Sequence, residues 1–247
     1  MIEKKIAIIS DIHGNSIALS EVIRDIRSRD IDTIINLGDS LYGPLDPKGT
    51  FDLLESNNVI SVSGNQDRII LENLDKTSDL ITLEYVKSQI DSTVVAWLNS
   101  LPFDMIYNDN IYCCHASPQS DMEYLLEYLE TNYVAIKDKQ GIDNLLSGIK
   151  QKVVICGHSH VPRIVEIDNK LIVNPGSVGL PAYDDDLPIY HKMENYNPRA
   201  NYAILNINGD SISVNRVSID YDHEKSAQLA EANMRNDWAK WIRTGIV

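Results

Sequence analysis

Two histidines with one serine between them follow an apolar run in the segment VVICGHSHV, residues 153–161. Four other strand-like runs are also followed by side chains that can bind metal ions: Asp11 and His13 after IAIIS, Asp39 after IINLG, Asn65 after ISVSG, and His115 after IYCC. A single histidine in such a place is more often a hydrogen-bonded core or loop residue than a ligand. Five strand ends with this feature favour one shared site, because open α/β sheets bind ligands at the carboxyl ends of their strands.

The types of these side chains indicate which metals they would bind. With His158 and His160 added, they comprise two aspartates, one asparagine and four histidines, and no thiolate. Such donors suit manganese, iron, zinc or cobalt better than a structural thiolate zinc site. Seven ligands are too many for one tetrahedral ion, and they fit two ions that share a bridging carboxylate. Two ions roughly 3.5–4 Å apart activate a water molecule and hold a phosphoryl oxygen. We therefore expect two metal ions, Mn²⁺ or Fe²⁺/Fe³⁺, with Zn²⁺ as the alternative.

The order of the motifs resembles a known family. DIHGN (11–15), GD (38–39), GNQD (64–67), His115 and GHSH (157–160) together resemble the calcineurin-like metallophosphoesterase superfamily. No DRG follows the GD motif as it does in Ser/Thr protein phosphatases, which points to the small prokaryotic phosphodiesterase branch. NPGSVG (174–179) also looks like the loop that follows the last metal motif in that branch. The resemblance covers roughly residues 5–180.

The resemblance implies roles for the matching residues. Asp11, His13 and His160 would hold one ion, Asn65, His115 and His158 the second, and Asp39 would bridge them. Asp67 would orient its neighbours, as metal ligands require. Many family members carry a histidine after the asparagine, thought to protonate the leaving oxygen. Gln66 stands there, and its amide has no titratable proton near neutral pH. We therefore expect activity on aryl esters or phosphoanhydrides and poor activity on alkyl esters, unless water or a residue such as His191 supplies the proton.

Alternating buried strands and helices predict an α/β fold with parallel β-α-β units. Leu19, Val22, Ile23 and Ile26 fall at helical spacing, and two hairpins are expected, with turns at 168–170 and 208–210. The expected layout is a single domain, 1–247, with two sheets sandwiched between helices. It includes a helical insertion at about 66–110 and an exposed C-terminal helix at about 224–243. The resemblance implies the same two-sheet β-sandwich flanked by helices, with α-β-β-α layers.

Residues 180–199 carry three prolines and no clear period, which predicts a long functional loop. This loop and the helical insertion flank the motifs, so we expect them to form the walls of the substrate pocket. Tyr183 and Tyr190 could stack on a nucleotide base, although simple packing explains them equally well. Asp184 to Asp186 read as a solvated loop tip, and His191 and His223 as surface residues.

The composition limits the partners. A formal net charge of −14 argues against extended nucleic acid and anionic membranes as partners. It allows an acidic small molecule held by metal ions. Three cysteines within apolar runs suggest buried thiols in a reducing cytosol. The N-terminal apolar stretch is too short for a signal peptide, and no window of about 18 apolar residues occurs, so we expect a cytoplasmic protein.

Rival chemistries lack their motifs. Position 13 is histidine where a haloacid-dehalogenase-type phosphatase needs aspartate, and neither a nucleophile elbow nor a phosphate-binding loop occurs. The expected function is hydrolysis of a phosphodiester, phosphoanhydride or activated phosphomonoester of a small molecule or nucleotide. The alternative is a metal-binding scaffold or protein-interaction module on the same fold. All seven ligand positions are filled, which favours the enzyme; the substrate and the oligomeric state stay open.

Overall fold

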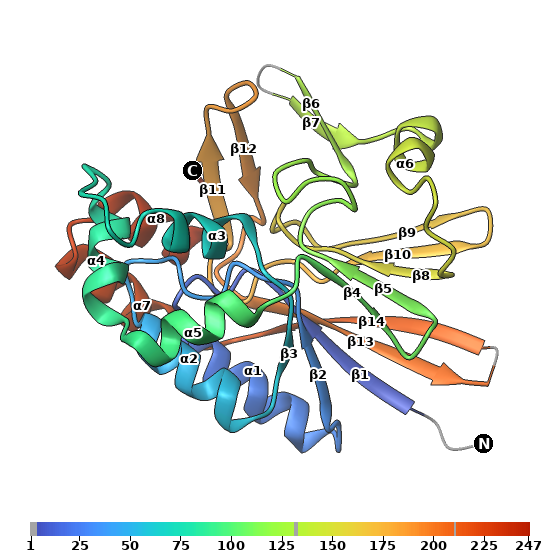
Figure 1. Ribbon diagram of the computed structural model, residues 1–247, viewed down its shortest axis with the longest axis horizontal. Coiled ribbons are helices and arrows are strands. Elements are labelled where there is room, and N and C mark those ends of the chain that lie inside the picture. The colour runs from blue at the N-terminus through green and yellow to red at the C-terminus, as the bar shows by residue number, and fades with distance from the viewer. Residues whose placement is uncertain (1–3, 131–132, 210) are drawn as a thin grey trace.

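Two five-stranded sheets form the centre of the computed structural model, which describes residues 4–130, 133–209 and 211–247 (Figure 1). The first sheet has the order β14 (Ser211–Ile219), β13 (Ala200–Asn208), β1 (Lys4–Ile9), β2 (Thr33–Asn36) and β3 (Ile60–Ser61). The second has the order β4 (Asp104–Tyr107), β5 (Ile111–Cys114), β8 (Val153–Ile155), β10 (Lys170–Asn174) and β9 (Arg163–Ile167). Each sheet pairs parallel strands, β1–β2–β3 and β5–β8–β10, with antiparallel neighbours.

The alternation of side chains along the buried strands explains how the sheets stack. In β1, Ile6 and Ile8 pack in the core between the sheets, where they join Cys113 and Val153 of the second sheet. Ala7 and Ile9 point to the opposite face of β1 and pack against the helices. Because successive side chains of a strand point to opposite faces, a strand buried on both faces is apolar throughout. The expected two-sheet sandwich is confirmed.

Eight helices are present in the described part of the chain. They are α1 (Ser16–Ser28), α2 (Pro47–Ser56), α3 (Asn65–Glu72), α4 (Ile81–Gln89), α5 (Ser92–Ser100), α6 (Lys139–Leu145), α7 (His223–Ala232) and α8 (Asn236–Thr244). Figure 1 shows α1 and α2 beside the first sheet and α6 beyond the second. α1 buries the face that its spacing predicts, and the Asn15 side chain caps it by accepting from the backbone N–H of Ala18.

The structure corrects three expectations about elements. The C-terminal tail holds two helices, α7 and α8, and it is not exposed, since Trp238 and Trp241 are buried. The segment 66–110 is helical only as far as Ser100, because β4 pairs with β5 at the edge of the second sheet. The stretch 180–199 forms a hairpin of β11 (Ala182–Asp185) and β12 (His191–Glu194).

Other expectations about the chain hold. The hairpins β9–β10 and β13–β14 are present, although the turn of the second includes residue 210, outside the described residues. A further hairpin joins β6 (Glu127–Glu130) and β7 (Tyr133–Ile136). The three cysteines are free and buried. Within the described ranges, no helix combines the length and the apolar character needed to cross a membrane.

Candidate metal centre

The predicted ligands meet at one edge of the sandwich, in loops that follow β1, β2, β3, β5 and β8. The loops pack so closely that only glycine fits at two contact points. A Cβ added to Gly64 would lie 2.2 Å from Asp39 Oδ1, and one added to Gly38 would lie 2.4 Å from the backbone nitrogen of Gly64. These glycines therefore let the loop after β2 and the loop after β3 bring Asp39 and Asn65 together.

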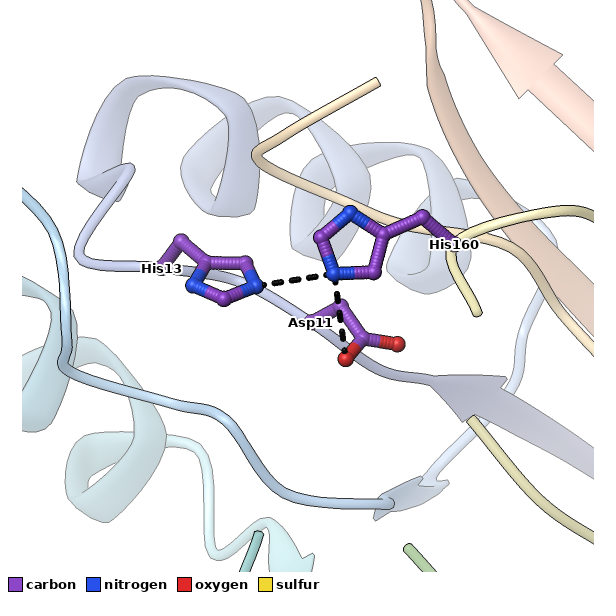
Figure 2. A group of neighbouring side chains, drawn as sticks. All are labelled: Asp11, His13 and His160. Carbon is purple, nitrogen blue, oxygen red and sulfur yellow. Dashed lines mark hydrogen bonds and ion pairs between the residues drawn. The ribbon is translucent and has the colours of Figure 1, made fainter. Parts of the chain in front are cut away.

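The first group of donors comprises Asp11, His13 and His160, all buried (Figure 2). Nε2 of His13 and Nε2 of His160 are 3.0 Å apart, and Nε2 of His160 lies 3.5 Å from Asp11 Oδ1. The other carboxylate oxygen of Asp11 accepts from the backbone N–H of His158 at 3.0 Å. Oδ1 of Asp11 has no hydrogen-bond partner among the described residues, so it is available to a ligand.

The second group comprises Asp39, His115 and His158, also buried. Nε2 of His115 lies 3.6 Å from Asp39 Oδ2 and 2.9 Å from Asn65 Oδ1, so Asn65 belongs with this group. Asp39 Oδ1 accepts from the backbone N–H of Gln66 at 2.9 Å, which fixes the carboxylate. All seven predicted ligands thus lie in two adjacent groups.

The hydrogen bonds of the four imidazoles fix where their lone pairs point. One ring nitrogen of each lies beside a backbone carbonyl oxygen: His13 Nδ1 at 2.9 Å from Tyr42 O, His115 Nδ1 at 2.8 Å from Leu37 O, His160 Nδ1 at 2.7 Å from Leu180 O, and His158 Nε2 at 3.1 Å from Met122 O. A carbonyl oxygen can only accept, so these nitrogens carry the proton and the opposite nitrogens carry lone pairs. The lone pairs of His13 and His160 therefore face each other, and a cation in contact with both nitrogens would relieve their repulsion. The residues fit metal ions.

Burial and crowding of like groups set the protonation states here. Burial, with the nearby His160, lowers the pKa of His13 to about 3. Burial, with the nearby His115, holds the pKa of His158 well below its ordinary value. Burial raises the pKa of Asp39 to about 7, and the carboxylates of Asp67 and Asp11 act in the same direction. Neutral imidazoles are the form that binds metals, and crowded carboxylates favour a cation beside them.

The backbone at the site adopts a conformation that L-residues avoid. Five of the seven predicted ligands have positive φ angles: 54° at Asp11, 54° at His13, 51° at Asp39, 70° at His158 and 59° at His160. A left-handed non-glycine residue costs on the order of 1–3 kcal/mol, and such residues gather at functional sites. This feature has no signal in the sequence, because it appears only when the loops are folded.

Two residues of the GNQD motif, Asp67 and Gln66, differ in what their side chains contact. Asp67 is fully buried, and its carboxylate accepts from the backbone N–H groups of Ser40 and Gly64, both at 3.0 Å. It therefore ties the loop of Asp39 to the loop of Asn65. Gln66 borders the cleft above the donors, and its side-chain Oε1 has no hydrogen-bond partner within the described ranges.

His191 corrects one expectation for the 180–199 segment, whereas Tyr183 and Tyr190 both border the cleft and their contact with a substrate stays a prediction. Tyr183 donates from its hydroxyl to the backbone oxygen of His158 at 3.1 Å, and its ring meets the His160 ring edge-on. His191 is fully buried, so the surface expectation is wrong, and its Nε2 lies 2.9 Å from the Tyr124 hydroxyl. Tyr190 is exposed at the rim of the cleft.

The remaining expectations for this region concern exposed residues. His223 is half-buried at the start of α7. Asp184 and Asp185 lie in β11 and border the cleft, and only Asp186 of the acidic run is exposed beyond the strand. The run is therefore part of a strand and of the cleft wall, not a solvated loop tip.

A cleft of about 780 Å³ opens above both groups of donors. The β11–β12 hairpin and Leu80 at the start of α4 form two of its walls, as expected for the two flanking segments. α8 forms a third wall with Arg235, Trp238 and Trp241, which the sequence reasoning missed. No motif marks these residues, and their only signal is the helical spacing of apolar residues in α8.

Residues 5–195 match the sequence profile of the calcineurin-like phosphoesterase superfamily domain. The chain belongs to this family. It is 29% identical over 260 residues to an uncharacterized protein of Methanocaldococcus jannaschii, with 96% of each chain covered. The fold is similar to that of a metallophosphoesterase from Sphaerobacter thermophilus, with a TM-score of 0.77, 23% identity, and 98% of this chain and 99% of that chain covered. A hypothetical protein from Pyrococcus horikoshii has a TM-score of 0.74 at 16% identity, with 98% of each chain covered.

Proposed function

We propose that this calcineurin-like phosphoesterase hydrolyses a small phosphorylated molecule with the help of two metal ions. The observation that carries the proposal is the pair of buried donor groups at the base of the cleft, with imidazole lone pairs that face each other and a free oxygen on Asp11. Two bound ions would supply an activated water and neutralise the charge that develops on the phosphoryl group.

The assignment of residues to ions follows the two groups. Asp11, His13 and His160 would hold one ion, and Asn65, His115 and His158 the other. Asp39 would bridge them. Its carboxylate faces His115 of the second group, and Asp11 of the first group is close enough to help raise the pKa of Asp39. The nitrogen and oxygen donors favour Mn²⁺ or iron, with Zn²⁺ as the alternative.

The residues at the cleft limit which leaving groups can depart. Gln66 cannot protonate a leaving oxygen, and both ring nitrogens of His191 are already used, one beside Ile189 O and one beside the Tyr124 hydroxyl. The proposed substrates therefore carry leaving groups that need little protonation, as in aryl esters, phosphodiesters of acidic alcohols, and phosphoanhydrides. The acidic net charge and the acidic residues of the cleft favour a small molecule or nucleotide over extended nucleic acid or a membrane.

The test combines metal content with turnover. Metal-stripped protein is refilled with Mn, Fe, Co, Ni, Zn or Mg, and hydrolysis of bis(p-nitrophenyl) phosphate is measured. We expect about two ions per chain and turnover in the loaded protein. Metal binding without turnover of any phosphoester would support the scaffold alternative instead.

Three aspartate variants sharpen the same test. Asp39→Asn should lose metal and more activity than Asp67→Asn, for which a loss of roughly 10–100-fold is typical of residues that only orient ligands. Asp32→Asn is the matched control, since the Asp32 side chain is fully exposed, and its activity should be unchanged. Full metal content with a normal rate in Asp39→Asn would end the two-metal proposal.

A further inference from the structure

Arg235 is the one arginine among the described residues that line the cleft, and no lysine accompanies it. Asp39, Asp184, Asp185 and Asp186 line the same cleft, so its walls are predominantly acidic. A substrate with a single phosphate needs only the proposed metal ions to offset this charge. A substrate with further negative charge is repelled by the acidic walls unless a second cation faces it.

Contacts with α4 and α8 hold Arg235 in place. Its Nε and Nη2 donate to the carboxylate of Asp237 at 2.9 and 2.6 Å, and its Nη1 donates to the buried hydroxyl of Thr82 on α4. A guanidinium carries five N–H groups. Two of them, one on each terminal nitrogen, are left without a partner among the described residues. The side chain is 23% exposed, so these donors can meet a ligand in the cleft.

One aromatic ring separates Arg235 from the first group of donors. The guanidinium lies over the Trp238 ring at 5.3 Å, and the Trp238 ring meets the His13 ring edge-on at 5.6 Å between centroids. Tyr42 borders the same cleft. Burial raises the pKa of its hydroxyl, which Arg235 lowers and Asp39 raises. Arg235 is therefore near the metal centre but not in contact with it.

We propose that Arg235 binds a second phosphate of the substrate, next to the phosphate that is hydrolysed, and so selects phosphoanhydrides. The inference rests on the proposed function. A guanidinium with two free, fixed N–H groups matches phosphate oxygens, and its hydrogen bonds to them are charge-assisted. In the reaction, a water oxygen forms the new P–O bond and releases a proton to the solvent, and the bridging P–O bond breaks. The electron pair leaves on the second phosphate, and Arg235 offsets its added negative charge.

Gln66 points to the same substrate class independently. A phosphate leaving group departs as a stable anion without a proton, so its departure does not need a proton donor at position 66. Arg235 also lies outside residues 5–195, the part of the chain that matches the family profile. The C-terminal helices of this chain therefore supply the group that sets specificity, while the matched part supplies the metal ligands.

The experiment compares two inhibitors that differ by one phosphonate group. Inhibition of bis(p-nitrophenyl) phosphate hydrolysis is measured with AMP and with α,β-methylene-ADP, which cannot be hydrolysed at the bridge. The natural protein should bind α,β-methylene-ADP about 10- to 100-fold more tightly than AMP, the range expected for hydrogen bonds to a charged group. In Arg235→Gln this preference should vanish. Arg235→Lys should keep part of the preference.

Two further variants separate binding from structure. Thr82→Val removes the contact between α4 and Arg235 but keeps the cation and its contacts with Asp237, so part of the preference should persist. Arg243→Gln removes an arginine of α8 that pairs with Glu224 and Glu231, and it should also leave the preference intact. If Arg235→Gln and Thr82→Val lose the preference for α,β-methylene-ADP equally, Arg235 acts only by connecting α4 to α8, and the proposal is overturned. The absence of this preference in the natural protein would also overturn it.

Binding can also be followed without turnover. Trp238 and Trp241 line the cleft, whereas the third tryptophan, Trp97, packs against Phe51 in another cluster. In a Trp97→Phe background, α,β-methylene-ADP should therefore change the fluorescence, and Arg235→Gln should weaken that response. If the protein hydrolyses no phosphoester, the proposed function fails, and this titration still decides whether Arg235 binds a second phosphate.

Discussion

At the scale of single residues, the site accepts unfavourable local chemistry. Left-handed backbone at His13 and His160 destabilises the folded chain. Lone pairs that face each other and crowded carboxylates add to this cost unless cations are bound. A core formed only for stability would replace such groups by apolar side chains. Their convergence therefore indicates a site kept for binding rather than for folding.

The glutamine at position 66, where many members of the family carry histidine, leads to a prediction about leaving groups. A general acid contributes roughly 10²–10⁴-fold to rate when the leaving group is a poor one. Over a series of phosphodiesters, the rate of the natural protein should fall steeply as the pKa of the leaving alcohol rises. Gln66→His should make the slope shallower, and Gln66→Asn, which adds no proton donor, should not. A flat series in the natural protein would mean that some other group donates the proton.

At the scale of elements, a buried hydrogen-bonded cluster joins the β11–β12 hairpin to the metal centre. The Tyr124 hydroxyl lies 2.6 Å from that of Tyr183 and 2.9 Å from Nε2 of His191, and the Tyr124 ring stacks on His158 at 4.5 Å. His191 Nδ1 lies beside a carbonyl oxygen, so Nε2 accepts and Tyr124 donates. The single hydroxyl proton of Tyr183 is then shared between the Tyr124 oxygen and the backbone oxygen of His158. The hairpin therefore positions His158 through two tyrosines.

The cluster can be tested at its centre. Tyr124→Phe leaves Nε2 of His191 buried without a donor, which should lower the free energy of unfolding by about 1–3 kcal/mol. Denaturant titration measures this change. The second metal equivalent should also bind more weakly than in the natural protein, because His158 loses its support. Tyr190→Phe, at an exposed tyrosine, is the control and should change neither quantity. Equal effects of the two variants would show that the cluster does not position His158.

The comparison of sequence with structure shows which features depend on local pattern. The ligands could be predicted because parallel strands end at one edge, so polar residues after apolar runs must meet there. His191 could have been placed, since HKME alternates buried and exposed residues in β12, but the prolines before it suggested a loop. Arg235 could not be predicted, because its place in the cleft depends on how α8 packs against distant parts of the chain.

At the scale of the whole molecule, the ligand loops come from both sheets. Asp11, Asp39 and Asn65 follow strands of the first sheet, whereas His115 and His158 follow strands of the second. The core between the sheets therefore sets the distance between the two donor groups, and the metal ions would in turn hold the sheets together at this edge. With a net charge of −14 on the chain, bound cations also reduce the general repulsion.

The most direct test of this account is anomalous scattering from crystals of the protein grown with Mn²⁺. We predict two peaks per chain, roughly 3.5–4 Å apart, one bounded by Asp11, His13 and His160 and the other by Asn65, His115 and His158, with Asp39 in contact with both. A single peak, or no peak at these side chains in protein that hydrolyses phosphoesters, would contradict the two-metal account.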